Sequence, residues 1–101
     1  MLFRSVEFRE QAADDLASLF DYLRGEASAR TAGEYVRRVH AACMALQLFP
    51  RRGALRPELG EHVRILGFER RVSIAYSVDG EVVEILGVFY AGRQILKSTL
   101  D

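Results

Sequence analysis

The stretch "RRVSIAYSVDGEVVEILGVFY", residues 70–90, decides the fold. It consists of two runs rich in β-branched and aromatic residues, which favour strands, on either side of Asp79-Gly80. Both residues of this pair tolerate positive φ, so the sequence predicts a tight antiparallel hairpin here. On the first strand the larger side chains alternate with small ones and should share the face that packs against helices. They are Val72, Ile74, Tyr76 and Val78.

Two further strands are predicted. The segment "HVRILGF", residues 62–68, is rich in strand formers and precedes the hairpin, with which it would form a three-stranded meander. The segment "LFRSVEF", residues 2–8, alternates in part and predicts a short first strand that ends near Phe8.

Two amphipathic helices are predicted between the first strand and the meander. The first runs from Arg9 to near Gly25, because its apolar residues recur every three or four positions. The second begins after Ser28, whose hydroxyl can accept a bond from the first turn, and ends before Pro50. A short linker should make the pair an antiparallel hairpin. The apolar stripe of the second helix comprises Ala32, Tyr35, Val36, Val39, Ala42, Cys43, Leu46 and Phe49.

The least regular segment is "PRRGALRPELGEH", residues 50–62, which contains both prolines and two glycines and predicts a loop with at most one turn. The whole order predicts an α+β fold: an N-terminal strand, an antiparallel helical hairpin, then a three-stranded antiparallel meander. The strands would form a mixed sheet with the hairpin on one face. No composition shift marks a boundary, so residues 1–101 are expected to form a single domain.

Composition limits the class of function. Lys plus Arg and Asp plus Glu both total 14, and a neutral chain does not indicate direct specific binding of nucleic acid. All cations except Lys97 are arginines, which indicates either an interface or a GC-rich genome. Cys43 is the only cysteine, which excludes an internal disulfide and fits the cytoplasm. No apolar run approaches the roughly 20 residues of a membrane span, so no membrane contact is expected.

Few residues suggest catalysis or metal binding. Cys43 lies on the apolar stripe and should pack as a small hydrophobe. Neither His40 nor His62 has Cys, Asp or Glu at a ligand spacing, so neither a metal nor a cofactor is expected. Asp14 and Asp15 are adjacent on the first helix, so their side chains diverge, and they should interact with its positive end.

Arginines are the remaining candidates for function. The entry to the third strand and the exit of the fourth should lie at the same end of the sheet, which would gather Arg70, Arg71 and Arg93. Arg64 lies on the second strand. Such side chains can hold phosphate or receive acidic groups of a protein partner. They can also form an ordinary solvated face, and composition does not decide between these.

The chain resembles the ParE toxins of bacterial type II toxin–antitoxin systems, within the RelE/ParE superfamily. The likeness covers nearly the whole chain. It is carried by "QAADDLASLFDYL" (11–23), "FPRRGALRPELGEHVRIL" (49–66), "VSIAYSV" (72–78) and "VEILGVFYAGR" (83–93). The resemblance implies the same order of strands and helices as the one derived above. It also implies a toxin that inhibits DNA gyrase by binding, with no catalytic residues.

The resemblance further implies a ParD-like antitoxin, a ribbon-helix-helix protein whose flexible C-terminal segment wraps the toxin in a hetero-oligomer. That segment would lie in the groove between helical hairpin and sheet, on exposed parts of the first helix. The residues implied to bind antitoxin or target are Leu16, Phe20, Tyr22, Leu23, Arg64, Arg70, Arg71, Tyr90 and Arg93.

Two alternatives remain open. A RelE-like toxin would cut mRNA on the ribosome, here with Arg64, Arg71, Tyr90 and Arg93. The RelE pattern is poorly met, because Ser73 stands where an arginine would be expected and the tail "QILKSTLD" contains no tyrosine. A toxin-derived chain that only binds its antitoxin is the other alternative.

Overall fold

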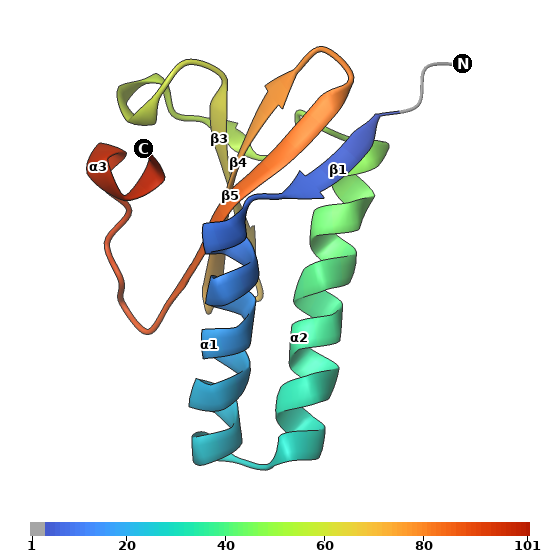
Figure 1. The fold of residues 1–101 in the computed structure, drawn as a ribbon, viewed down its shortest axis with the longest axis vertical. Coiled ribbons are helices and arrows are strands. Elements are labelled where there is room, and N and C mark those ends of the chain that lie inside the picture. Colours follow the sequence, from blue (N-terminus) through green and yellow to red (C-terminus); the bar gives the residue numbers. More distant parts are fainter. Residues whose placement is uncertain (1–3) are drawn as a thin grey trace.

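The computed structural model describes residues 4–101, which combine one sheet with a helical hairpin (Figure 1). The elements are β1 (Ser5–Phe8), α1 (Glu10–Glu26), α2 (Ala29–Met44), the 3₁₀ turn η1 (Ala45–Gln47), β2 (Ala54–Leu55), the 3₁₀ turn η2 (Pro57–Leu59), β3 (Val63–Phe68), β4 (Val72–Asp79), β5 (Val82–Tyr90) and α3 (Lys97–Leu100). The sheet has the spatial order β1-β5-β4-β3-β2. β1 is parallel to β5 and the other pairs are antiparallel, which confirms the predicted mixed sheet and α+β class.

The central hairpin pairs β4 with β5, as predicted, but its turn is displaced by one residue. Asp79 pairs with Val82 as part of the ladder, so the two turn residues are Gly80 and Glu81. Gly80 has φ of 59°, whereas Glu81 is not in the positive-φ region. A glycine with positive φ at the first turn position is typical of a type II′ turn, whose twist suits flanking strands.

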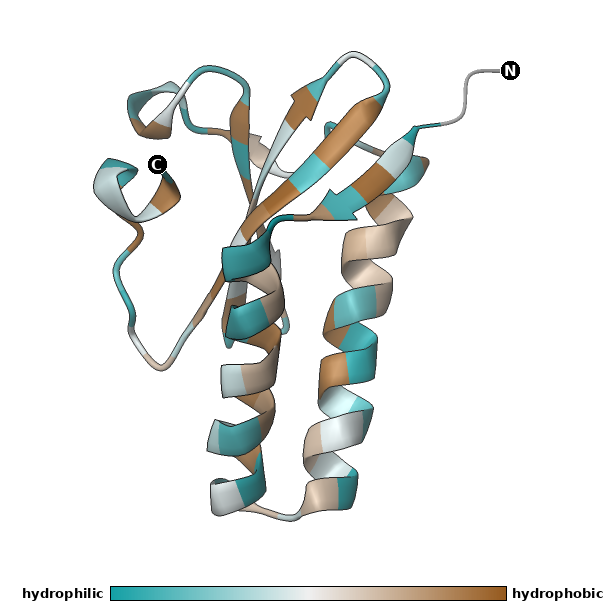
Figure 2. Ribbon diagram, viewed as in Figure 1, coloured by the Kyte–Doolittle hydropathy of each residue, from teal (hydrophilic) through white to brown (hydrophobic). Residues whose placement is uncertain are grey.

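Helices α1 and α2 lie side by side and cover one face of the sheet (Figure 1). Each helix carries hydrophobic and hydrophilic residues, as expected when only one side faces a core (Figure 2). Three of the four larger β4 side chains are fully or almost fully buried in that core, and Val78 packs against it, which confirms their predicted face. Ser28 caps α2 as predicted, because its hydroxyl oxygen accepts a bond from the Thr31 N–H.

One prediction on the second helix is wrong. The predicted apolar stripe includes Phe49, but 65% of the surface of this residue is exposed. The α-helix ends at Met44 and continues as η1, which has about three residues per turn, so the apolar positions no longer stay on one side. Leu46 remains fully buried, while Leu48 and Phe49 point to solvent.

The second face of the sheet has its own apolar cluster, which the sequence did not predict. Two segments that cover this face are η2, which precedes the meander in the sequence, and α3, which follows it. The segment 50–62 is also more ordered than predicted, because Ala54 pairs with Ile65 and adds a fifth strand at the edge. The members of this cluster are Leu59, Val63, Ala75, Leu86 and Leu100, with Ile65, Phe89 and Ile95 packed against them.

At the N-terminal side, the predicted first strand is confirmed for Ser5–Phe8, while residues 2 and 3 lie outside the described range. Within residues 4–101, no helix combines the length and apolar character needed to cross a membrane.

Candidate partner-binding site

A pocket of about 260 Å³ opens between the helical hairpin and one end of the sheet. It forms there because Val72 pairs with Tyr90, so the start of β4 and the end of β5 lie together, as predicted. We call it the helix–sheet pocket. Its lining residues are Leu19, Tyr22, Leu23, Tyr35, Arg70, Arg71, Val72, Tyr90, Ala91 and Gly92.

The turn between β3 and β4 brings two arginines to the pocket. Glu69 and Arg70 both have positive φ, at 51° and 59°, which reverses the chain within three residues. Arg70 and Arg71 therefore follow one another at the rim and are exposed. Such backbone geometry is uncommon for residues other than glycine, so this turn is held by its surroundings.

Tyr35 on α2 packs against this turn. Its ring lies 5.5 Å from the guanidinium carbon of Arg71 and 5.0 Å from that of Arg38, both within cation–π range. Arg38 also donates two hydrogen bonds to the Glu69 carboxylate, at 3.1 and 3.3 Å, which ties α2 to the turn. Burial, and then the nearby charge of Glu69, raises the pKa of Tyr35, so its phenol stays protonated. Its hydroxyl is buried and makes no hydrogen bond within the described chain.

After the end of β5, Arg93 lies over the ring of Tyr90, with its guanidinium carbon 4.5 Å from the ring centroid. The chain turns back after β5 because Ala91 and Gly92 have φ of 55° and 74°, and the Arg93 N–H donates to the Tyr90 carbonyl. Tyr90 is buried and packs on Tyr22 with ring centroids 5.4 Å apart. The cation is thus exposed above an aromatic pair that borders the pocket.

The structure brings together most, but not all, of the predicted site. Leu23, Arg70, Arg71 and Tyr90 line the pocket, whereas Arg93 contacts the Tyr90 ring but lines a separate hollow. Tyr22 also lines it and is 41% exposed. Leu16 and Phe20 do not line it and are half-buried against the main core.

Arg64 lies apart from the predicted arginine group. Its guanidinium donates to the carbonyl oxygens of Gly53 at 2.8 Å and Arg51 at 3.3 Å, and so braces the segment before β2. Arg64 pairs with Tyr76, which is four residues beyond Val72, or about 13 Å along β4. The sequence could not separate Arg64 from the others, because the register of β3 was not known.

Neither histidine lies at the pocket. His40 stacks on Phe8 with ring centroids 5.1 Å apart, and His62 lies in the turn before β3 with positive φ. Tyr35 and Tyr90 are the buried tyrosines of the pocket, and its charged residues, Arg70 and Arg71, are cations. Cations and aromatic rings of this kind suit binding of carboxylates or phosphates rather than proton transfer.

Asp15 has a role that the sequence did not predict. It is buried, and its carboxylate accepts hydrogen bonds from the Val88 N–H and the Gln11 side-chain amide, each at 2.9 Å. The Val88 N–H belongs to β5, where a register shift opposite Ala75 and Tyr76 interrupts the ladder. Asp15 thus fastens α1 to this irregular strand, whereas Asp14 is exposed.

The family model described as "ParE toxin of type II toxin-antitoxin system, parDE" matches residues 6–95. The chain belongs to this ParE toxin family. No curated protein sequence matches it significantly.

Two solved structures show the same fold. One is titled "Chromosomal ParDE TA system from P. aeruginosa"; it is 27% identical, with a TM-score of 0.76 over 87% of this chain and 96% of that chain. The other is the toxin–antitoxin complex RelBE2 from Mycobacterium tuberculosis; it is 25% identical, with a TM-score of 0.61 over 88% of this chain and 99% of that chain. This ParE-family toxin is therefore similar in structure to members of both branches of the superfamily.

Proposed function

We propose that this ParE-family toxin inhibits DNA gyrase by binding it, and that a ParD-like antitoxin neutralises the toxin by forming a hetero-oligomer with it. The proposal rests first on membership of the ParE family. Because gyrase is a bacterial cytoplasmic enzyme, the toxin would act in the cytoplasm.

The composition of the helix–sheet pocket supports a binding role. Apolar and aromatic side chains line its inside, and Arg70 and Arg71 stand at its rim with Arg93 close by. This is the character of a protein interface, in which aromatic residues and arginines dominate the binding energy. In the proposal, a segment of the antitoxin covers the pocket, and the three arginines meet acidic groups of the antitoxin or of gyrase.

The RelE-like alternative, cleavage of mRNA on the ribosome, has one specific observation in its favour, the similarity to the RelBE2 complex. Its candidate residues are Arg64, Arg71, Tyr90 and Arg93. The position of Arg64 argues against their acting as a set, because its guanidinium is engaged by backbone carbonyls at a distance from the pocket. A metal-free nuclease also needs groups that move protons, and neither histidine is near.

One paired experiment tests the proposal. Purified toxin is incubated with gyrase and relaxed plasmid, and in parallel with a translating ribosome extract whose mRNA is mapped by primer extension. We expect loss of supercoiling or trapped DNA breaks in the first reaction and intact mRNA in the second. Toxin-dependent cuts within codons, with unimpaired gyrase, would refute the proposal in favour of the nuclease. Inactivity in both reactions would leave the chain as an antitoxin-binding protein without a toxic target and would also refute it.

A further inference from the structure

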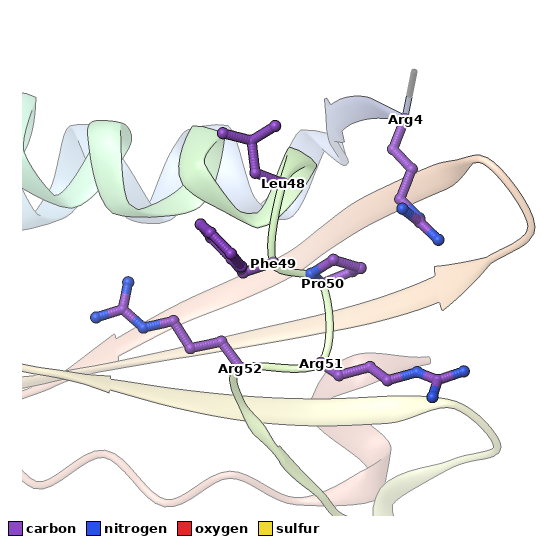
Figure 3. Close-up of a pocket in the computed structure, with 6 residues that line it drawn as sticks. All are labelled: Arg4, Leu48, Phe49, Pro50, Arg51 and Arg52. Carbon is purple, nitrogen blue, oxygen red and sulfur yellow. The ribbon is translucent and has the colours of Figure 1, made fainter. Parts of the chain in front are cut away.

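A second surface, far from the helix–sheet pocket, has the features of an interface. Leu48 is 73% exposed and the adjacent Phe49 is 65% exposed. They line a shallow hollow of about 740 Å³ together with Pro50 and three arginines (Figure 3). We call this surface the arginine-rimmed patch; its residues are Arg4, Leu48, Phe49, Pro50, Arg51 and Arg52.

The exposure of the apolar pair is fixed by the backbone. The N–H groups of Leu48 and Phe49 both donate to the Ala45 carbonyl, at 3.1 and 3.3 Å, and the Arg52 N–H donates to the Phe49 carbonyl at 3.2 Å. The hydroxyl of Tyr76 then donates to the Pro50 carbonyl at 2.8 Å from inside the core. The loop is therefore anchored in a shape that holds two large apolar side chains in water. Neighbouring exposed apolar groups of this size mark a surface that another molecule covers.

The charges around the pair indicate what that molecule carries. Arg4 is the residue before β1, while Arg51 and Arg52 follow Pro50 and their side chains extend in different directions (Figure 3). Within residues 4–101, none of these three guanidiniums takes part in an ion pair. The patch thus combines an apolar centre with an unneutralised positive rim, although the chain has no net charge.

This combination disfavours a second copy of the toxin. A symmetric contact would place the three arginines of one patch against the same three of the other, and like charges across an interface are unfavourable. Nucleic acid fits poorly as well, because the more exposed of the two apolar side chains is Leu48, which has no ring on which a base can stack.

We propose that the arginine-rimmed patch is a second docking surface for the antitoxin, and that it receives an acidic amphipathic segment. Apolar side chains of the segment sit on Leu48 and Phe49, and its carboxylates pair with Arg4, Arg51 and Arg52. This inference rests on the proposed antitoxin. A neutralising antitoxin has to remain bound to the toxin, so its complex would be long-lived. Long-lived complexes are the ones that bury large apolar side chains.

The strand β4 connects the two surfaces through the core. Tyr76 contacts Pro50 at the patch, and Val72, four residues earlier on β4, lines the helix–sheet pocket. The two positions are about 13 Å apart along the strand. Because this part of β4 is buried, an antitoxin that covers both surfaces has to follow the molecular surface around the core.

Two double variants test the proposal, Leu48→Ser with Phe49→Ser and Arg51→Glu with Arg52→Glu. The matched controls are Leu96→Ser, an apolar residue that is 47% exposed outside the patch, and Arg30→Glu, whose side chain is 89% exposed on α2. The probe is the small protein encoded next to the toxin gene, titrated by calorimetry in about 50 mM and about 300 mM NaCl. Gyrase inhibition without that protein is measured in parallel, and circular dichroism checks that each variant is folded.

We expect each patch variant to bind the probe about 100-fold more weakly than wild type, because exposed anchor residues at an interface typically contribute tenfold or more each. The controls should stay within about threefold of wild type. Added salt should weaken binding of the wild type more than that of the arginine variant. Gyrase inhibition by the patch variants should equal that of wild type.

The outcomes separate the two proposals. If both folded patch variants bind the probe as wild type does, the patch proposal is wrong while the antitoxin assignment stands. Patch variants that keep full affinity for the probe but no longer inhibit gyrase would assign the patch to the target instead. If wild type itself does not bind the probe, both proposals are refuted. If the patch variants bind the probe weakly but even the wild-type toxin does not inhibit gyrase, the patch proposal is supported and only the gyrase target is refuted.

Discussion

Arg93 lies on Tyr90 at the edge of the helix–sheet pocket, where its cation can meet an acidic group of a partner. We expect Arg93→Ala to weaken binding of antitoxin or gyrase about tenfold, since hydrogen bonds to charged groups contribute about 1.5–3 kcal/mol. The free energy of unfolding should fall by no more than about 1 kcal/mol, the size of an exposed cation–π contact. Calorimetric titration and urea denaturation give the two values. Arg30→Ala, at an exposed position on α2, is the control, and equal partner binding by both variants would argue against a role for Arg93.

Asp15 is the residue for which sequence reasoning was least informative. The helical pattern suggested an interaction with the positive end of α1, whereas the buried carboxylate accepts the Val88 N–H on β5. Nothing in the local sequence signals a bond that joins residues 73 positions apart. By contrast, the start of β4 and the end of β5 were correctly placed at the same end of the sheet, because antiparallel pairing alone brings those ends together.

Removal of the Asp15 carboxylate should therefore weaken the attachment of α1 to β5. Asp15→Ala would leave a buried strand N–H without an acceptor, and we expect a loss of about 1–3 kcal/mol in the free energy of unfolding. Asp15→Asn should cost less, because its amide oxygen can still accept that bond. Chemical denaturation followed by circular dichroism measures both. A loss of the same size for Asp14→Ala, at the exposed neighbouring position, would contradict this account.

At the scale of elements, one tyrosine fixes the loop that carries the arginine-rimmed patch. The Tyr76 hydroxyl accepts a hydrogen bond from the Gly53 N–H and donates one to the Pro50 carbonyl, both at 2.8 Å. A β-carbon at Gly53 would approach the Tyr76 hydroxyl and the Ile65 carbonyl to 2.8 Å, so only glycine fits there. The sequence predicted a buried Tyr76 and an irregular loop, but it did not predict that the Tyr76 hydroxyl anchors this loop.

We therefore expect Tyr76→Phe to loosen residues 50–53 and to cost about 1–3 kcal/mol, because it leaves a buried N–H and a carbonyl unpaired. Arg51 and Arg52 are trypsin sites in this loop, so limited trypsin digestion should cut the variant there several times faster than wild type, in proportion to local opening. Mass spectrometry identifies the cut. Tyr22→Phe is the control, because Tyr22 is 41% exposed. An unchanged rate of cleavage after Arg51 and Arg52 in Tyr76→Phe would show that the loop does not depend on this hydroxyl.

For the whole molecule, the amphipathic patterns were sufficient to place the helical hairpin and the meander on a common core. They failed where the pattern changed period, as at η1, where Phe49 leaves the core face. They also failed on the second face of the sheet, because Leu59 and Leu100 come from short turns with no periodic signal and meet only in the folded chain. The exposed apolar pair of the patch could thus be recognised only once the end of α2 was known.

The main core also gives the molecule a predictable response to alkaline pH. Cys43 is fully buried in it, and burial raises the pKa of the thiol from 9.0 to about 12. As pH rises above 9, the unfolded chain loses this proton while the folded chain keeps it, so the free energy of unfolding falls until about pH 12. At pH 10.5 the difference corresponds to about 2 kcal/mol. Burial also raises the pKa values of Tyr35 and Tyr76, which lowers stability in the same direction.

Comparison of wild type with Cys43→Ala isolates the thiol, because the tyrosine contribution is common to both proteins. Urea denaturation at about pH 7.5, 9 and 10.5 should show the variant less stable at neutral pH, from the lost packing, but less sensitive to alkali by about 2 kcal/mol. The two stability curves should therefore converge as pH rises. Curves that stay parallel from pH 7.5 to 10.5 would mean that the folded and unfolded states bind the Cys43 proton equally well, and that the thiol is not shielded in the core.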